Sequence, residues 1–339
     1  FNTVYQLMAV KQQTPEFLQQ AKTLLMLPDY FGFRLTGNKL SEYTNGSTTQ
    51  LVNPDTFQWD KELIRKLGYP EDIFLPLQMP GTKVGQLLPE IQKEVGFDLE
   101  VVLCGSHDTA SAVMAVPQTE GDGIYISSGT WSLMGIESLK PVITEDAAAA
   151  NFTNEGGYNH RFRFLKNIMG LWMIQSVRHE YNDAYSFAQL CDMAEESKEF
   201  PSRVDVNDQS FLSPDSMVEA IRQYCHKTGQ PVPESVGELT SVVYRSLAQS
   251  YGETVRGLEK IAGKTYDSIH IIGGGSNAAY LNQLTADATG KTVYAGPGEA
   301  TAIGNLLAQM IHAGDLADLK SARKCVRESF EIKTFAPAK

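Results

Sequence analysis

The run from Gly105 to Ala115 holds the residues of this chain that are best suited to chemistry. It follows an apolar segment, Leu99 to Cys104, so it predicts a strand, a glycine turn and then a helix. Such a transition places the carboxylate of Asp108 at the mouth of a cleft, with His107 and Thr109 beside it. One carboxylate held in this way suits a general base that takes a proton from an alcohol. The simpler alternative is that Asp108 only caps the helix.

The helix predicted after Asp108 carries small side chains at Ala110, Ser111, Ala112 and Ala115. Small side chains keep a helix thin. We therefore expect another element of the protein to pack closely against it.

Two glycine turns have the composition of anion-binding sites. Ser127-Ser128-Gly129-Thr130 is predicted to join two strands, where backbone N–H groups can approach an anion and Thr130 adds a hydroxyl. Gly273-Gly274-Gly275 follows a buried strand and opens a helix at Ser276, which puts backbone and a positive helix end against a flat or anionic ligand. It is neither a dinucleotide fingerprint nor a Walker loop. The alternatives are an ordinary hairpin for the first turn and, for a third turn at Ala295–Ala300, a structural loop.

Two amides complete the candidate site. Asn167 and Gln175 are expected on one helix, Leu165 to Glu180, where eight positions leave them about 80° apart. In that arrangement they bracket a polyhydroxylated ligand and a nucleotide. The alternative is a pair of solvent-exposed amides, and Trp131 and Trp172 are expected in the core.

Composition narrows the function classes. The 339 residues carry a net charge of −11, which argues against nucleic-acid and membrane partners. No apolar run approaches the roughly 20 residues of a membrane span. The four cysteines are scattered without metal-site spacing, so we expect reduced thiols, no protein-held metal and a cytoplasmic location.

Strands alternating with helices predict an α/β protein of two domains. The segment Pro117 to Gly123 is the expected boundary. Helices are expected at Thr14 to Leu25, Asp60 to Lys66, Pro89 to Val95, Val236 to Ile261, Ser276 to Thr289 and Ala300 to Ala313, and strands at Thr82–Val84, Ile124–Ser128, Ser132–Ile136 and Ile269–Ile272.

The motifs together resemble the FGGY carbohydrate kinase family. They are Gly105-Ser-His-Asp-Thr-Ala-Ser-Ala-Val113, Ser127-Ser-Gly-Thr-Trp-Ser-Leu-Met-Gly135 and Ile271-Ile-Gly-Gly-Gly275, in this order, with Leu25–Phe31, Arg34–Gly37 and Glu42–Asn45 upstream. The resemblance implies an actin-like ATPase (ribonuclease-H-like) α/β fold with a ligand cleft between two domains. Residues 1–116 are then the remainder of an N-terminal sugar-binding domain, and residues 117–339 a C-terminal nucleotide-binding domain.

The resemblance also implies roles for single residues. Asp108 resembles the catalytic base that deprotonates the C1 hydroxyl of the sugar, with His107, Thr109 and Asn167 as substrate contacts. Thr130 resembles the phosphate-binding threonine, and Gln175 and Gly274 resemble nucleotide contacts. The implied substrates are ATP and L-rhamnulose, as in L-rhamnose catabolism, with Mg²⁺ neutralising phosphate charge.

The sequence departs from the family pattern at three places. No Asp-x-Gly phosphate loop precedes Asp108, so we expect this chain to be the C-terminal portion of a longer enzyme. Ala278 stands where the family often has asparagine, which leaves the contact near adenine open. Val242 occupies the expected partner position of Cys225, so the disulfide of some relatives is not expected here.

Two alternatives stay open. One is another FGGY kinase that acts on xylulose, ribulose, fuculose or glycerol. The other is a non-catalytic actin-like ATP-binding protein, which would bind nucleotide without sugar-stimulated turnover.

Overall fold

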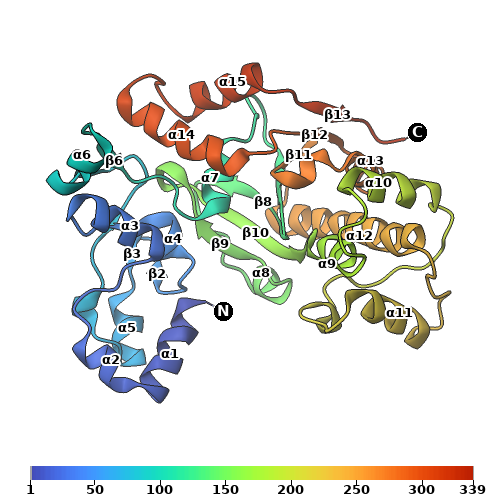
Figure 1. Cartoon of the computed structure of the whole chain (residues 1–339), viewed down its shortest axis with the longest axis horizontal. Helices are drawn as coiled ribbons and strands as arrows, with labels where there is room; N and C mark the ends of the chain where they lie inside the picture. Colours follow the sequence, from blue (N-terminus) through green and yellow to red (C-terminus); the bar gives the residue numbers. More distant parts are fainter. Residues whose placement is uncertain (1, 339) are drawn as a thin grey trace.

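The computed structural model describes residues 2–338, and its first part is built from short elements. The helices of this part are α1 (Thr3–Gln13), α2 (Pro15–Gln20), α3 (Leu27–Thr36), α4 (Tyr43–Ser47), α5 (Lys61–Leu67), the 3₁₀ helix η1 (Glu71–Ile73) and α6 (Pro89–Val95). Its strands pair two by two, β1 (Ser41–Glu42) with β4 (Leu77–Gln78), β2 (Val52–Asn53) with β3 (Gln58–Trp59), and β5 (Lys83–Gln86) with β6 (Glu100–Val102). A separate small core that includes Tyr43, Leu51 and Ile64 holds these elements together. In Figure 1 they lie to one side of the large sheet.

A seven-stranded mixed sheet in the order β13-β12-β11-β7-β8-β10-β9 forms the centre of the second part. Its strands are β7 (Ile124–Ser128), β8 (Trp131–Ser138), β9 (Thr153–Gly156), β10 (Phe162–Met169), β11 (Ser268–Ile272), β12 (Thr292–Ala295) and β13 (Lys333–Phe335). The pairs β7–β8, β8–β10, β10–β9 and β12–β13 are antiparallel, whereas β11 pairs in parallel with both β7 and β12.

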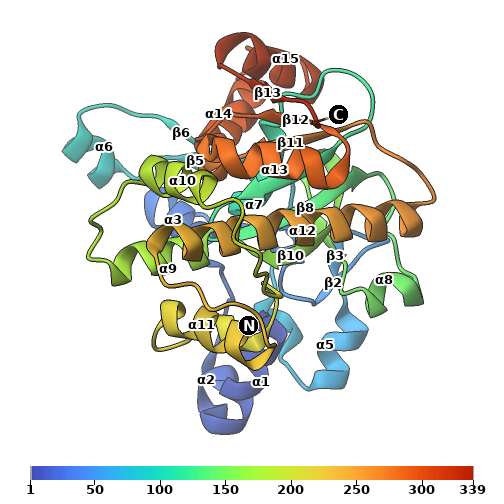
Figure 2. The same ribbon diagram turned by 90° about the vertical axis from the view of Figure 1, so that its right-hand side faces the viewer.

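Helices cover both faces of this sheet. They are α7 (Asp108–Met114), α8 (Glu145–Ala149), α9 (Trp172–Glu180), α10 (Phe187–Glu196), α11 (Met217–Lys227), α12 (Val236–Ala262), α13 (Ala279–Thr289), α14 (Ala300–Ala313) and α15 (Leu319–Ser329), with the 3₁₀ helices η2 (Tyr158–His160), η3 (Gln209–Phe211) and η4 (Gly274–Asn277). One core joins the sheet to α7, α14 and α15, and a larger one joins it to α9, α10, α12 and α13. Figure 2 shows α12 running the width of the second face. The predicted α/β class is therefore confirmed.

Long helix α12 illustrates how the sequence encodes these elements. Ser235 caps its first turn by accepting from the Glu238 N–H, and the Glu238 side chain accepts from the Ser235 N–H in return. Apolar residues at helical spacing then face the core, and Gly263 ends the helix in the left-handed conformation at φ 62°. No helix within residues 2–338 combines the length and apolar character needed to cross a bilayer.

Three predicted elements are wrong. Residues Leu165 to Met169 do not form the start of a helix but belong to strand β10, because they pair with β8 from Gly135 to Trp131. The first predicted helix ends at Gln20 rather than Leu25, since Leu24 forms a bridge with Phe74. The helix predicted from Ser276 begins at Ala279 instead, because Ser276 and Asn277 belong to the 3₁₀ helix η4 and Ala278 is the N-cap of α13.

Candidate functional site

The turn before α7 presents Asp108 to solvent. Asp108 is the first residue of the helix, and the N-cap residue is His107. The alternative that Asp108 only caps the helix is therefore wrong. The Oδ1 atom of Asp108 accepts from the N–H and the hydroxyl of Thr109 at 2.6 and 3.3 Å. The side chain is otherwise 78% exposed. Its carboxylate is therefore accessible to an incoming alcohol.

A buried carboxylate fixes the position of this turn. Glu42 accepts hydrogen bonds from the N–H groups of Thr44 and Asn45 at the start of α4, and from the N–H and hydroxyl of Ser106 at 3.1 and 2.6 Å. Burial raises the pKa of Glu42, and the hydrogen bonds from Ser106 and Thr44 oppose that rise. Glu42 thus joins α4 to the segment that carries Asp108. The sequence places Glu42 in the Glu42–Asn45 motif but does not indicate this role.

Helix α14 holds α7 from the other side. A Cβ added at Gly304 would lie 1.8 Å from the carbonyl oxygen of Ser111, so the two helices approach through backbone at this point. The hydroxyl of Thr301 donates to the Asp108 carbonyl at 3.3 Å. This close approach confirms the prediction from the small residues of α7.

A cleft of about 1090 Å³ opens at the Asp108 turn and takes residues from both parts of the chain. Of the predicted site residues, five line it: His107, Asp108, Thr109, Thr130 and Asn167. The lining also includes Gln50 and Thr48 from the first part, and Glu155, Lys166 and Trp131 from the second. The structure therefore brings a free carboxylate, a hydroxyl-bearing glycine turn and an amide together around one space.

The two amides and two tryptophans differ from expectation. Asn167 lies on β10 opposite Leu133, whereas Gln175 lies on α9, so they do not share a helix. Both remain half-buried, but only Asn167 lines the cleft. Trp131 is 37% exposed and lines the cleft, and Trp172 is 36% exposed, so the expected core positions of both are wrong.

The glycine triplet lies beside the first glycine turn. Gly273 has φ 83°, a conformation that favours glycine, and a Cβ at Gly275 would meet the Ser128 Oγ at 1.9 Å. Gly274 itself is exposed and has open space in front of it. The triplet is outside the lining of the cleft but packs on the strand that ends in the Thr130 turn. An extended ligand that begins at Thr130 can therefore continue past Gly274.

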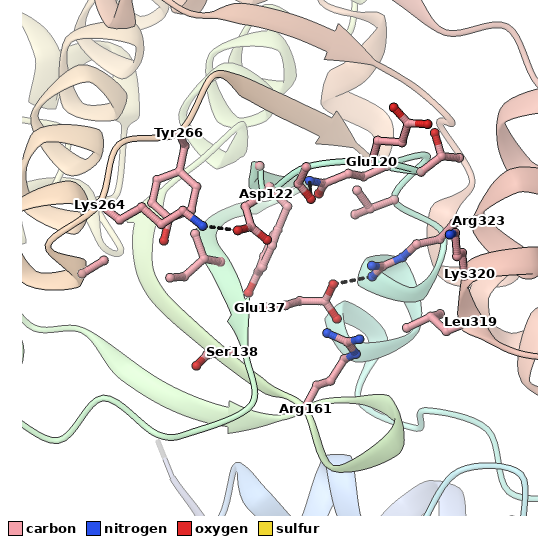
Figure 3. A pocket seen from close by; sticks show the side chains of 18 of the residues that line it. Glu120, Asp122, Glu137, Ser138, Arg161, Lys264, Tyr266, Leu319, Lys320 and Arg323 are labelled. Atoms are coloured by element: carbon pink, nitrogen blue, oxygen red, sulfur yellow. Dashed lines mark hydrogen bonds and ion pairs between the residues drawn. The ribbon is translucent and has the colours of Figure 1, made fainter.

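A second cavity, of about 520 Å³, lies under the boundary segment 118–123. Figure 3 shows its two ion pairs, Lys264 with Asp122 and Arg323 with Glu137. None of the predicted site residues lines it.

No group of three or more His, Cys, Asp or Glu side chains within the described part of the chain has a metal-binding arrangement. Among the groups that line the cleft, His107 contacts Arg163 and Glu155 is ion-paired to the same arginine.

Comparison with known proteins gives two family matches that together cover most of the chain. Residues 1–115 match the N-terminal domain of the FGGY family of carbohydrate kinases, and residues 124–313 match its C-terminal domain. A rhamnulokinase of Halalkalibacterium halodurans is 52% identical over all of this chain and 72% of its own length. A rhamnulokinase of Oceanobacillus iheyensis is 49% identical over 99% of this chain and 71% of its own length.

Solved structures agree on the fold. A ligand-bound xylulose kinase from Lactobacillus acidophilus superposes with a TM-score of 0.77 at 18% identity, over 99% of this chain and 68% of that one. At this identity the likeness concerns the fold alone. It is the actin-like ATPase fold of two-domain sugar kinases, as the sequence predicted.

Proposed function

Because the chain belongs to the FGGY family of carbohydrate kinases, we propose that it transfers the γ-phosphoryl group of ATP to the C1 hydroxyl of L-rhamnulose. The observation that carries this proposal is the exposed Asp108 carboxylate in a cleft that also contains the Thr130 turn. The choice of sugar is supported by relatives that carry the name rhamnulokinase at 40 to 52% identity.

In the proposed reaction, Asp108 takes the proton of the C1 hydroxyl while the sugar oxygen forms a bond to the γ-phosphorus. The bond from that phosphorus to the β–γ bridging oxygen breaks, and ADP leaves with the electron pair. Most of the catalysis in such a transfer is positioning and stabilisation of phosphate charge, so one base and a set of fixed donors suffice on this wall of the cleft. The products are L-rhamnulose 1-phosphate and ADP.

The remaining residues receive roles from their places. His107, Thr109 and Asn167 are proposed sugar contacts, because they line the same cleft as Asp108. Thr130 is the proposed phosphate contact through its hydroxyl, which stands at a turn that lines the cleft. Gly274 and Gln175 are proposed nucleotide contacts along the extension from that turn.

Magnesium is proposed as the companion of ATP. Since no cluster of three metal-binding side chains occurs within residues 2–338, the ion would take most of its ligands from phosphate oxygens and water. It would neutralise phosphate charge there, and no step assigned to the residues above depends on a protein-held ion.

We also propose that residues 1–116 serve mainly the sugar and residues 117–339 the nucleotide, and that a first phosphate loop comes from protein outside this chain. The chain spans about 72% of the length of its relative from H. halodurans. Helix α3 has an exposed apolar face, Leu27, Tyr30, Phe31 and Leu35, that such a segment could cover. A cytoplasmic location belongs to the same proposal, because the phosphoryl donor is ATP.

The test of the substrate is a sugar screen with coupled detection of ADP, using L-rhamnulose, L-fuculose, D-xylulose, L-ribulose and glycerol. We expect the highest kcat/KM with L-rhamnulose in the full-length protein, and no sugar-dependent ADP release by residues 1–339 alone. Preference for another sugar would change the substrate, whereas nucleotide binding without turnover on any sugar would favour the non-catalytic alternative. Robust turnover by the 339-residue chain would show that no outside phosphate loop is required.

A further inference from the structure

Three side chains from separate elements meet directly behind the Asp108 turn. They are His107, Glu155 on β9 and Arg163 on β10, and the last two are cross-strand partners. Nη2 of Arg163 lies 3.0 Å from Oε2 of Glu155 and 3.2 Å from Nδ1 of His107. Nε of the same arginine donates to the Gly156 carbonyl at 3.0 Å. The guanidinium is thus held by β9 on one side and contacts the histidine on the other.

The chemistry of arginine determines the state of this histidine. A guanidinium has only donors, so Nδ1 of His107 must accept and can carry no proton. The imidazole is then neutral, with its proton on Nε2. Nε2 is the nitrogen that faces Asp108, 3.8 Å from Oδ1.

The surroundings of His107 reinforce this state. Burial lowers the pKa of His107, and the charge of Arg163 lowers it further, whereas Glu155 and Asp108 act in the opposite direction. These three are the charged groups that face the ring. The backbone N–H of His107 donates to the Thr44 hydroxyl at 3.3 Å, which fixes the main chain but leaves the ring to Arg163.

Burying Arg163 costs more free energy than a purely structural position requires. Its side chain is fully buried, and its Nη1 has no hydrogen-bond partner among residues 2–338. A buried charge with an unsatisfied donor is less favourable than a well-packed apolar side chain of the same volume. Arg163 does not line the cleft itself. It contacts His107 and Glu155, which do.

We propose that Arg163, oriented by Glu155, is a positioning residue that keeps His107 neutral and directs its Nε2–H to a sugar oxygen beside Asp108. This inference rests on the proposed function, because it names the state in which one proposed sugar contact acts. His107 is then a hydrogen-bond donor to the sugar. The opposite tautomer has a lone pair at Nε2 and cannot donate, and a cationic ring would pair with the Asp108 carboxylate 3.8 Å away.

The direct test is the tautomer in the unaltered protein. The chain has six histidines, so selective ¹⁵N-histidine labelling gives a spectrum that a His107→Gln variant can assign. We expect a neutral ring protonated on Nε2 at pH 7. A ring protonated on Nδ1, or a cationic ring at pH 7, overturns the proposal without any substitution of Arg163.

The second test removes the pair. The double variant Arg163→Met with Glu155→Gln takes away both charges, so no unpaired carboxylate is left buried. We expect its affinity for L-rhamnulose to fall about tenfold at pH 7, the equivalent of one hydrogen bond, and the ¹⁵N spectrum of its His107 to show the Nδ1–H tautomer as well. ATP affinity should be unchanged.

Arg161→Met is the matched control, because Arg161 lies on the same segment but lines the second cavity. It should leave sugar affinity and the tautomer of His107 unaltered. A double variant with wild-type affinity and His107 still only in the Nε2–H tautomer contradicts the inference, and the proposed function survives if Asp108→Asn still abolishes turnover. An active Asp108→Asn enzyme would instead refute the proposed function, while the tautomer measurement would still judge the role of Arg163.

Discussion

The contact between α7 and α14 makes a sharp prediction for Gly304→Ala. The added Cβ would lie 1.8 Å from the Ser111 carbonyl oxygen and 2.4 Å from the Ser111 carbonyl carbon. Real Cβ atoms essentially never approach closer than 3.0 Å, so the helices must separate by about 1.2 Å. Both obstacles are backbone atoms, which no side-chain rotation can remove.

This displacement should reach the candidate base. Ser111 stands three residues after Asp108 on the short helix α7, so a shift of α7 moves Asp108 by about the same amount. A misplacement of about 1 Å costs on the order of 10²-fold in rate. Overpacking costs about 1–3 kcal/mol, and the higher helix propensity of alanine offsets about 0.5–1 kcal/mol of this. We therefore expect kcat to fall by about 10- to 100-fold and the free energy of unfolding to fall by about 1–2 kcal/mol.

Gly257→Ala is the matched control, since Gly257 also lies inside a helix but its added Cβ would meet only Phe152 at 3.9 Å. This variant should gain about 0.5–1 kcal/mol of stability and keep its turnover. Urea unfolding and a coupled ADP assay on the full-length protein measure both quantities. If Gly304→Ala is as stable as the wild type and keeps kcat within about threefold, α14 does not determine the position of Asp108.

Three further substitutions test separate parts of the account. Thr130→Val removes the hydroxyl that is proposed to contact phosphate. Gly274→Ala adds a methyl group into space that the protein leaves open for a ligand. Calorimetry should show weaker ATP or ADP binding by each variant, with sugar affinity retained. The reverse pattern would exchange the two subsites. Burial and the neighbouring Glu42 raise the pKa of Asp29 to about 7 from 3.8, so the folded protein holds a proton that the unfolded chain releases, and stability falls as pH rises between these values. Asparagine at this position can still accept a hydrogen bond from the Glu42 N–H. The Asp29→Asn variant should therefore not lose stability as the pH rises, and above pH 7 its free energy of unfolding should exceed that of the wild type by up to about 4 kcal/mol. Equal pH dependence of urea unfolding in the two proteins would contradict this.

Elements with local signals could be predicted from the sequence. Helix α5 begins after the Asp60 cap and ends at Gly68, and α14 ends at Gly314, because caps and left-handed glycines act within a few residues. The β7–turn–β8 hairpin was also predicted, from apolar strands around a glycine turn. Strand β10 was mistaken for a helix because its conformation depends on pairing with β8 and β9 at once, which the local spacing of its apolar residues does not reveal.

The candidate site divides in the same way. Asp108 and Thr130 stand in short motifs whose glycine and small residues indicate a turn. The position of each residue at a turn could therefore be predicted from the sequence. Arg163 and Glu42 could not, because their importance arises from partners far along the chain, His107 for the arginine and Ser106 for the carboxylate. A buried charge in a strand gives no local sign of the residue that it orients.

The central claim is that Asp108 is the base of a sugar kinase, and Asp108→Asn tests it most directly. Asparagine keeps the shape and can still accept from the Thr109 N–H, but it cannot take the proton of the C1 hydroxyl. We predict that kcat for ATP and L-rhamnulose in the full-length protein falls by about 10²- to 10⁴-fold, while sugar affinity measured by calorimetry stays within about threefold of the wild type. A variant that keeps more than about a tenth of the wild-type kcat would contradict the assignment of Asp108 as the base.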